Sequence, residues 1–505
     1  MLSHANYQVY GTAIFAAIGG FLFGYDLGVI SGVITMSNFL SVFGDQTSIS
    51  RGSLTSGIAG SIVGVMSVGC FVGALLAGQA SDRFSRKYSI VLFSVIFVLS
   101  GALQGGSSNL TILLISRLIA GISVGALSMI VPVYQSEIST KEIRGRLVSF
   151  QQWAITIGIA VSFWTNYGTN LYFASSSASW RIPLGLQVLP ALILAIGIPF
   201  FPYSPRWLMA QGRESEAFAV LRNLRSSSSQ QDIFIEFNEI KQEIIAENEQ
   251  SVRSYSQLVQ FPLRRRLILG LTIQIFQQLT GINSIMYYAP AIFKQAGLSG
   301  QRAALLATGI NGCINVLATI PAILYLDEWG RRPVLIVGGI IMSFAMLTIG
   351  SIMGIHGYTV FNSTTSYTII VLVYIFVAAF AASWGPTTWL YCTEIFPLSM
   401  RAKGTSLTTA AIWVTNCFVS FLVPALLERI TYGTYLIFGS FCFIMSVIVF
   451  IFYPETKGRS LEEMDLIFSD SIFVGSSYKT KKNINKKKQF HPRIQMYDSY
   501  RVEYL

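Results

Sequence analysis

An aspartate and an arginine lie inside stretches that are otherwise apolar. Asp26 stands in GYDLGVISG, residues 24–32, and Arg117 stands in ISRLIAGISVG, residues 115–125. Ionising either side chain in apolar surroundings is costly, and an opposite charge nearby offsets that cost. A carboxylate that leaves such an arginine without regaining water tends to take up a proton, which it releases on return. The two residues therefore predict either a proton-carrying pair or a permanent structural ion pair.

Amide side chains form a second group of polar residues in apolar stretches. They are Gln152, Gln277, Gln278, Asn283 and Asn315. Each amide offers a donor and an acceptor without carrying charge. On a continuous helix Gln278 and Asn283 would point about 140° apart, and a break near Gly281 would bring them closer. Taken alone, such amides also fit hydrogen bonds between neighbouring membrane helices.

The composition indicates a membrane protein. Of the 505 residues, 52% are hydrophobic and 12% are charged, and this charged share is about half of that in soluble proteins. The five cysteines lack ligand spacing and the three histidines are scattered, so we expect neither a metal site nor a disulfide framework. The sequence shows no nucleotide-binding loop and no nucleophile triad. We therefore expect no enzyme activity, no cofactor and no nucleic-acid partner.

Apolar runs of about 20 residues, the length that crosses a bilayer, recur along the chain. They predict twelve spanning helices in two groups of six around a polar stretch, 202–266. The predicted spans are 10–34, 55–79, 88–107, 110–134, 147–167, 181–201, 267–293, 304–326, 333–355, 367–391, 402–425 and 433–453. At 1.5 Å per residue, Asp26 lies about 12 Å and Arg117 about 10 Å from the same membrane face, so the two side chains can meet.

The distribution of charge predicts the orientation. Lys and Arg gather in the loops after the second, fourth, eighth and tenth spans, in the polar stretch and in the tail. The positive-inside rule then places both termini in the cytoplasm. The sequons at Asn109 and Asn362 fall on the other side and are candidate glycosylation sites. We expect a multi-pass protein of the plasma membrane.

The polar stretch and the tail have their own patterns. SEAFAVLRNLR and IEFNEIKQEIIAEN, both within 206–266, predict short amphipathic helices in the cytoplasm. The tail, 457–505, contains KTKKNINKKK. It fits either a segment that lies on anionic lipid or a disordered, regulated end.

The two halves of the chain resemble each other. ASDRFSRK after the second span matches LDEWGRRP after the eighth, since each has an acid four and five residues before two basic residues. YQSEISTKEIR after the fourth span matches YCTEIFPLSMR after the tenth, and PYSPRW after the sixth matches PETKGR after the twelfth. Three matched pairs in the same order predict a duplicated six-helix unit. Transporters with a midplane site between two repeats have this architecture.

These motifs, together with SRLIAGISVG, QQLTGINSIMYY and EIFPLSMRAKG, resemble those of the sugar porters of the major facilitator superfamily, especially fungal monosaccharide transporters. The resemblance covers residues 8–468. It implies an all-α major facilitator fold with a cytoplasmic helical linker. Some family positions differ: Gln79 replaces an arginine, Ser85 a glycine, Glu328 a basic residue and Tyr203 an acid.

The resemblance also implies a substrate and its site. A hexose is neutral and covered in hydroxyls, and its desolvation is costly unless each hydroxyl is paired again. The five amides are the positions that the family uses for this, and the family also pairs Asp26 with Arg117. Trp384 is expected to contact the sugar ring and Trp389 to line or gate the site. The eleventh span contributes Asn416, although Ile412 replaces an amide found in relatives.

Charged residues at the cytoplasmic ends of the spans predict a lattice that joins the two bundles in one state and parts in another. Its members are Asp82, Arg86, Lys87, Glu137, Arg144, Arg206, Asp327, Arg331, Arg332, Glu394, Arg401 and Glu455. The alternative is that these charges only fix the topology.

The sequence thus predicts a carrier that moves a monosaccharide, glucose or another hexose or xylose, by alternating access with proton symport. The alternatives are a passive facilitator, a polyol or inositol carrier, and a transporter-like sugar sensor. The predicted parts are an N-terminal bundle (1–205), the linker (206–266), a C-terminal bundle (267–456) and the basic tail (457–505). We expect a monomeric transport unit whose partners are the sugar, the proton and the bilayer.

Overall fold

The structure is a computed structural model that describes residues 4–140, 143–226, 229–249, 255–260, 263–298, 300–356 and 363–457. Every regular element within these ranges is a helix. The N-terminal half contains α1 (His4–Ala16), α2 (Ile18–Val33), α3 (Ser37–Phe43), α4 (Gln46–Arg51), α5 (Ser56–Gly105), α6 (Leu110–Ile138), α7 (Arg144–Phe173), α8 (Ala178–Leu186), α9 (Val188–Gly197) and the short 3-10 helix η1 (Ile198–Phe200).

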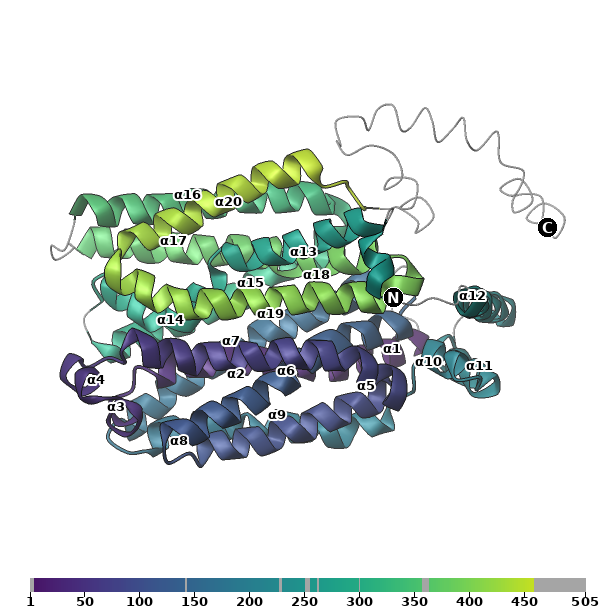
Figure 1. Cartoon of the computed structure of the whole chain (residues 1–505), viewed down its shortest axis with the longest axis horizontal. Helices are drawn as coiled ribbons and strands as arrows, with labels where there is room; N and C mark the ends of the chain where they lie inside the picture. The colour runs from purple at the N-terminus through teal and green to yellow at the C-terminus, as the bar shows by residue number, and fades with distance from the viewer. Residues whose placement is uncertain are drawn as a thin grey trace.

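The linker contains α10 (Pro205–Ala210), α11 (Glu214–Leu224), α12 (Gln230–Glu249) and η2 (Tyr255–Val259). The C-terminal half contains α13 (Leu263–Leu279), α14 (Ile282–Gln295), α15 (Gln301–Trp329), α16 (Arg331–His356), α17 (Ser363–Ala382), α18 (Trp384–Ile395), α19 (Leu398–Arg429) and α20 (Tyr432–Phe452). The two halves lie one above the other in Figure 1, and both views keep them apart as separate bundles.

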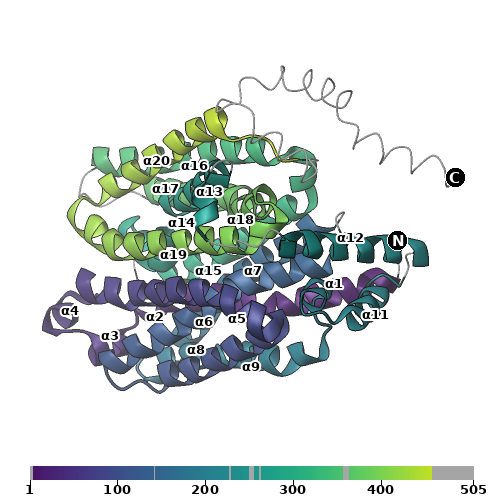
Figure 2. The ribbon, with the colours of Figure 1, turned by 45° about the vertical axis from the view of Figure 1, so that its right-hand side comes forward.

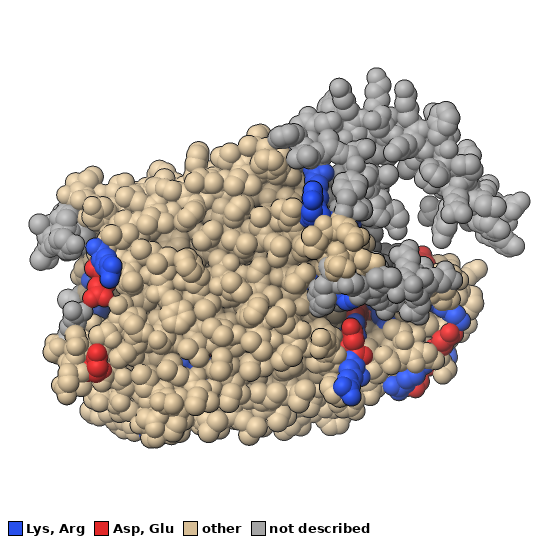
Figure 3. Space-filling model, viewed as in Figure 1, with Lys and Arg blue, Asp and Glu red and all other residues tan. Residues whose placement is uncertain are grey.

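The bundle has two distinct ends. The helices α10, α11 and α12 lie at one end, which we call the linker end, and α3 and α4 lie at the opposite one, the far end (Figure 1). In Figure 3 the charged side chains gather at these two ends, and a broad uncharged belt separates them. Such a belt matches the hydrocarbon core of a bilayer.

The predicted spans are present. The second and third spans form one helix that folds back, and the seventh span consists of two shorter helices. Ten helical stretches among the described residues are long and apolar enough to cross a membrane. One of these, α5, has 50 residues and folds back at Ser85, so it supplies two spans. The broken pair α13 and α14 completes the predicted set of twelve.

The two halves repeat the same contacts at the linker end. The Tyr134 hydroxyl donates to the carbonyl of Pro202 at 2.6 Å, and the Tyr391 hydroxyl donates to that of Pro454 at 3.3 Å. In the repeat, Tyr391 occupies the position of Tyr134 and Pro454 that of Pro202. Each bond ties the fourth span of a half to the end of its sixth span.

The amphipathic helices predicted in the linker are confirmed. They correspond to α11 and α12, which pack together with α10 around a small apolar cluster. This cluster consists of Leu208, Met209, Ala217, Leu221, Ile233 and Ile240. The linker therefore has a core of its own next to the bundle.

The fold-back of α5 forces a serine into a backbone conformation suited to glycine. Ser85 has φ 74° and ψ 159°, a region that is essentially limited to glycine. The repeat places Gly330 at the equivalent position, with φ 85° and ψ 156°. The N-terminal half thus has the same turn as the C-terminal half but lacks the glycine that adopts it without strain. Ser85 is also buried.

We predict that Ser85→Gly stabilises the protein. Strain of this kind costs about 1–3 kcal/mol, part of which is offset by the greater freedom of glycine in the unfolded chain. The melting temperature of the purified protein should rise, as measured by tryptophan fluorescence. The reverse change, Gly330→Ser, should lower it, because a Cβ there would lie 2.8 Å from Glu455 Oε2. A lower melting temperature for Ser85→Gly would contradict the strain argument.

Candidate functional site

A cavity lies between the two halves near the centre of the bundle. The cavity is small, with a volume of about 20 Å³. Residues of α6 and α7 line one side and residues of α18 the other. The lining residues are Pro132, Val148, Ser149, Gln151, Gln152, Ile155, Pro386 and Trp389. Among the residues expected to bind a substrate, Gln152 and Trp389 therefore face this space directly.

Two of the expected amides keep their hydrogen-bonding groups unused. Within the part of the chain that the structure describes, the side chains of Gln152 and Asn315 make no hydrogen bond. Asn315 is buried in α15. A Cβ on Gly385 would lie 3.4 Å from Gln152 Nε2, so α18 lies next to the Gln152 side chain of α7. Both amides are able to pair with a polar, uncharged ligand.

A helix break orients the QQLTGIN amides. Helix α13 ends at Leu279, α14 starts at Ile282, and Gly281 between them has φ 85°. A side chain at Gly281 would also clash with Phe438, whose Cγ would lie 2.7 Å from its Cβ. The break brings Gln278 and Asn283 together. Asn283 Nδ2 donates a hydrogen bond to Gln278 Oε1 at 2.8 Å. The expected approach of these two residues is confirmed.

Gln277 points to a second helix break. Its Nε2 donates to the carbonyls of Trp384 and Gly385 at 3.2 and 3.3 Å. These carbonyls open α18, which is separated from α17 by the non-helical Ser383. Gln277 therefore joins the two interrupted spans of the C-terminal half, the seventh and the tenth.

Asn416 joins Asn283 to the opposite half. Its Oδ1 accepts from Asn283 at 3.0 Å, and its Nδ2 donates to Ser67 Oγ at 3.1 Å and to Tyr287 Oη at 3.2 Å. The residue is fully buried. These bonds make Asn416 a bridge between the two halves, and its role as a direct substrate ligand stays a prediction. Sequence reasoning missed Ser67, which no motif marks, and Tyr287, which lies within QQLTGINSIMYY.

The two tryptophans of WGPTTW lie in different surroundings. Trp384 is fully buried, and its indole N–H donates to the carbonyl of Leu335 in α16 at 2.8 Å, inside the C-terminal half. The sugar contact expected of Trp384 stays a prediction. Trp389 lines the cavity, as expected of a residue that lines or gates the site.

A further tryptophan escaped the sequence reasoning. Trp413 of α19 packs edge-on against Phe23 of α2, with ring centroids 5.1 Å apart. Its indole N–H donates to Ser128 Oγ of α6 at 3.4 Å. Trp413 lies three residues before Asn416 and shares its helix face, a spacing that could have identified it.

Asp26 and Arg117 face each other at the core of the N-terminal half. Arg117 Nη1 lies 3.6 Å from Asp26 Oδ1, and both side chains are fully buried. Arg117 also donates from Nε to the carbonyl of Ile62 at 2.6 Å, and its Nη2 lies 3.3 Å from Met66 Sδ. Neither oxygen of Asp26 accepts a hydrogen bond from a described residue. The guanidinium is thus anchored to α5, while the carboxylate depends on the ion pair.

The glycines of GYDLGVISG explain how α2 presents this carboxylate. A Cβ on Gly24 would lie 1.9 Å from the carbonyl oxygen of Ile155, so α2 and α7 pack backbone against backbone. Along the same helix face, a Cβ on Gly28 would lie 2.1 Å from Ser162 Oγ and a Cβ on Gly32 would lie 2.5 Å from Asn166 Nδ2, so these glycines make room for side chains of α7. Asp26, on another face, is left to meet Arg117 of α6.

The charged residues of the N-terminal half form a compact group at the linker end. Arg86 Nη1 lies 3.1 Å from Asp82 Oδ1, and Arg86 Nη2 lies 3.0 Å from Glu137 Oε1. Lys87 donates to the carbonyls of Pro199 and Phe201 at 3.1 and 3.2 Å. These contacts join the second and third spans to the fourth and sixth.

Tyr203 makes the charged group of the N-terminal half differ from that of the C-terminal half. The Lys87 ammonium lies 4.0 Å from the centroid of the Tyr203 ring, which stacks on Trp207. A hydrogen bond with Tyr88, together with burial, raises the pKa of Tyr203. The aromatic ring thus holds a cation at the position where the other repeat has Glu455.

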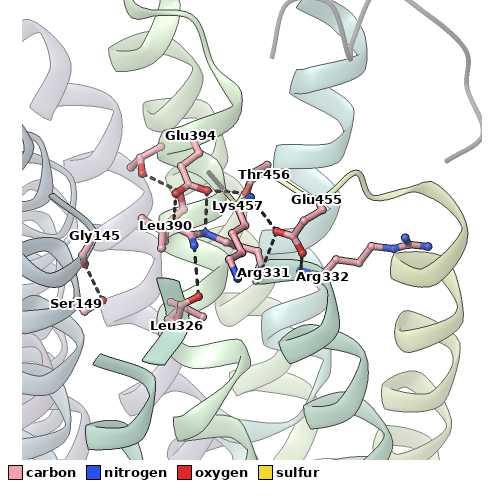
Figure 4. A network of polar contacts seen from close by, with 11 residues as sticks. Gly145, Ser149, Leu326, Arg331, Arg332, Leu390, Glu394, Glu455, Thr456 and Lys457 are labelled. Carbon is pink, nitrogen blue, oxygen red and sulfur yellow. Dashed lines mark hydrogen bonds and ion pairs between the residues drawn. The ribbon is translucent and has the colours of Figure 1, made fainter. Parts of the chain in front are cut away.

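The C-terminal half builds its group around carboxylates (Figure 4). Arg331 Nη2 lies 2.6 Å from Glu394 Oε1, and Glu394 Oε2 accepts from Thr456 at 2.7 Å. Glu455 accepts from the backbone N–H groups of Arg331 and Arg332 at 2.9 and 3.0 Å. It therefore caps the start of α16, where the helix dipole favours negative charge.

Each of the ion pairs just described joins helices of a single half. The side chains of Arg144, Asp327 and Arg401 lie outside the described residues, as do Asn362 and the tail from residue 458. Arg206 lies in α10, beside the end of the sixth span. Asn109 is exposed and caps α6 by accepting from the backbone N–H of Ile112 at 2.9 Å.

Comparison with known proteins agrees with this arrangement. The family described as "Sugar (and other) transporter" matches residues 12–468. The chain belongs to this sugar transporter family of the major facilitator superfamily. It is 36% identical to an MFS glucose transporter of Aspergillus flavus, over 92% of this chain and 90% of the relative. It is 34% identical to a high-affinity glucose transporter of Kluyveromyces lactis, over 92% and 86%.

Solved structures of this sugar transporter family share the fold. The proton:xylose symporter XylE bound to 6-bromo-6-deoxy-D-glucose aligns with a TM-score of 0.80 at 30% identity, over 92% of this chain and 100% of that one. The inward-open form of XylE from E. coli aligns with a TM-score of 0.71 at 30% identity, over 91% and 99%. The described residues therefore resemble the sugar-bound form more than the inward-open one.

We predict that Gly24→Ala disrupts the packing of α2. The added Cβ would overlap the carbonyl of Ile155, and overpacking of this kind costs about 1–3 kcal/mol or more. The melting temperature of the purified protein should fall. Gly57→Ala is the matched control, because no atom lies within 4 Å of a Cβ there. Equal melting temperatures for the two variants would refute the close approach of α2 and α7.

Proposed function

We propose that this member of the sugar transporter family carries a monosaccharide together with a proton across the plasma membrane by alternating access. The observation that carries the proposal is the fully buried Asp26 carboxylate, which faces Arg117 at 3.6 Å and accepts no hydrogen bond from a described residue. A buried charge with so few partners is costly. A carboxylate that moves away from Arg117 in these surroundings takes up a proton, and it releases the proton when the ion pair forms again.

The chemistry of the amides supports the choice of substrate. Gln152 offers an unused amide at the cavity, and the buried amides of Asn315, Gln278 and Asn283 add donors and acceptors without charge. The ring of Trp389 offers an apolar face of the kind that packs on a sugar ring. The relatives named above as glucose transporters make a hexose the first candidate, and the xylose symporter makes xylose the second.

The orientation rests on charge. Arg86 and Lys87 lie at the linker end, where Trp207 of α10 donates to the carbonyl of Asp82. The positive-inside rule then assigns the linker end, and with it both termini, to the cytoplasm. One chain supplies both the amides and the ion pair, which supports a monomeric transport unit. The charged groups of the two halves would rearrange as the halves rock about the cavity.

We predict that Asp26→Asn abolishes uphill accumulation while sugar exchange continues. The asparagine keeps the shape of the side chain but has no proton to release, so an imposed pH gradient no longer drives uptake. Purified protein in proteoliposomes is given radiolabelled D-glucose or D-xylose, with or without a pH gradient that is acid outside. Counterflow in the same vesicles reports exchange without a gradient.

The same assay separates the alternatives. Wild-type counterflow without any response to the pH gradient would indicate a passive facilitator. Binding without counterflow would indicate a sensor. Uphill uptake by Asp26→Asn at the wild-type level would remove Asp26 from proton coupling.

We predict that Gln152→Ala weakens sugar affinity roughly 5- to 30-fold, because one or two hydrogen bonds to sugar hydroxyls are lost. The apparent KM for D-glucose counterflow measures this change. Gln104→Ala is the matched control: that amide is buried in α5 and does not line the cavity. If both variants keep the wild-type KM, Gln152 is not a sugar ligand.

A further inference from the structure

Helix α5 contacts two groups through neighbouring residues. One is Arg117, the partner of Asp26, and the other is Asn416, which leads to the amides of Asn283 and Gln278. Arg117 donates to the carbonyl of Ile62 and contacts the sulfur of Met66. The next residue, Ser67, accepts from Asn416 of the other half at 3.1 Å. Adjacent residues of a helix point about 100° apart, so one turn of α5 faces Arg117 on one side and Asn416 on the other.

From Asn416 the contacts continue to two amides of QQLTGIN, Asn283 and Gln278. Its Oδ1 accepts from Asn283, and Asn283 also donates to Gln278. A series of side-chain contacts therefore runs from Arg117 to Met66 and from Ser67 to Asn416 and the QQLTGIN amides, and the backbone of α5 joins Met66 to Ser67. Ser67 is its crossing point between the halves, and it is 1% exposed.

We propose that Ser67 is the positioning residue that links the protonation of Asp26 to the affinity for sugar. The inference rests on the proposed proton-coupled function. When Asp26 becomes neutral, Arg117 loses its counterion, and its remaining partners in this series are the Ile62 carbonyl and the Met66 sulfur of α5. A buried cation then draws more strongly on those partners.

A shift of this turn of α5 moves Ser67 relative to Asn416. Asn416 in turn holds Asn283, so the amides that pair with sugar hydroxyls respond to the proton. Linkage is reciprocal, so a bound sugar must also change the proton affinity of Asp26. Sugar and proton thereby favour each other's binding through one hydroxyl group.

The groups around Asp26 leave few other sources of pH dependence. Besides Arg117 of α6, the titratable side chains near the pair are Cys70 of α5 and Tyr287 and Tyr288 of α14. Thiols and phenols have reference pKa values of about 8.5 and 10 and stay neutral below pH 7. An affinity change between pH 5.5 and 7 therefore reports on Asp26.

Binding of D-glucose to the purified full-length protein at pH 5.5 and 7 tests the link, by titration calorimetry, with D-xylose as a second probe. We expect wild type to bind about tenfold more tightly at the lower pH, a coupling in the usual range. Ser67→Ala should bind sugar with less than a twofold pH effect. Ser67→Thr, which keeps the hydroxyl, should restore most of the effect.

Tyr287→Phe is the matched control, because it removes the other bond donated by Asn416 Nδ2 and leaves α5 untouched. It should keep the pH effect. An undiminished pH effect in Ser67→Ala, beside a pH-dependent wild type, overturns the role of Ser67 and leaves proton coupling intact. A wild type without any pH effect overturns the proposed function together with this inference. If the alanine variant does not fold, Ser67→Cys, whose sulfur is a weak acceptor, must show the same loss.

Discussion

The burial of one opposite charge pair constrains the whole N-terminal half. Asp26 and Arg117 are both fully buried, and removing either partner would leave the other charge unpaired at a cost of several kcal/mol. Three spans are tied to this pair: α2 carries the carboxylate, α6 the guanidinium, and α5 the carbonyl of Ile62 that anchors the guanidinium. The close packing of α2 on α7 at Gly24 follows from the same need, since it fixes the helix face that Asp26 occupies.

The C-terminal half differs in that two of its spans are interrupted. The breaks at Gly281 and Ser383 expose backbone groups and turn amides inward, and Gln277 links the two breaks by donating to the carbonyls that open α18. Interrupted spans are tolerated in a bilayer where the protein itself covers the freed groups. Duplicated halves have thus diverged, so that one buries an ion pair and the other presents amides.

The sequence predicted the fold, and two contacts within the candidate site, because these signals were long or strongly spaced. Apolar runs predicted the spans, and matched depths predicted the approach of Asp26 to Arg117, which the structure places 3.6 Å apart. Single side-chain directions escaped prediction. Trp384 and Trp389 lie five residues apart on one helix, and only tertiary packing against Leu335 decides which ring faces the cavity. Ser67 belongs to no motif, and its importance depends on a residue 349 positions away.

Because the ion pair lies in one half and the amides of α13 and α14 lie in the other, any coupling between them depends on contacts across the interface of the two halves. Under the proposed function, a proton on Asp26 of α2 and a sugar at the amides of α13 and α14 influence each other through groups that touch both bundles, and rocking of the bundles alters such contacts. Bonds such as Asn416 to Ser67 and Trp413 to Ser128 meet this requirement, since each joins α19 to the N-terminal half. The ion pairs described at the linker end brace each bundle internally. Under the proposed function, such bracing lets a local shift at the interface move one whole bundle against the other.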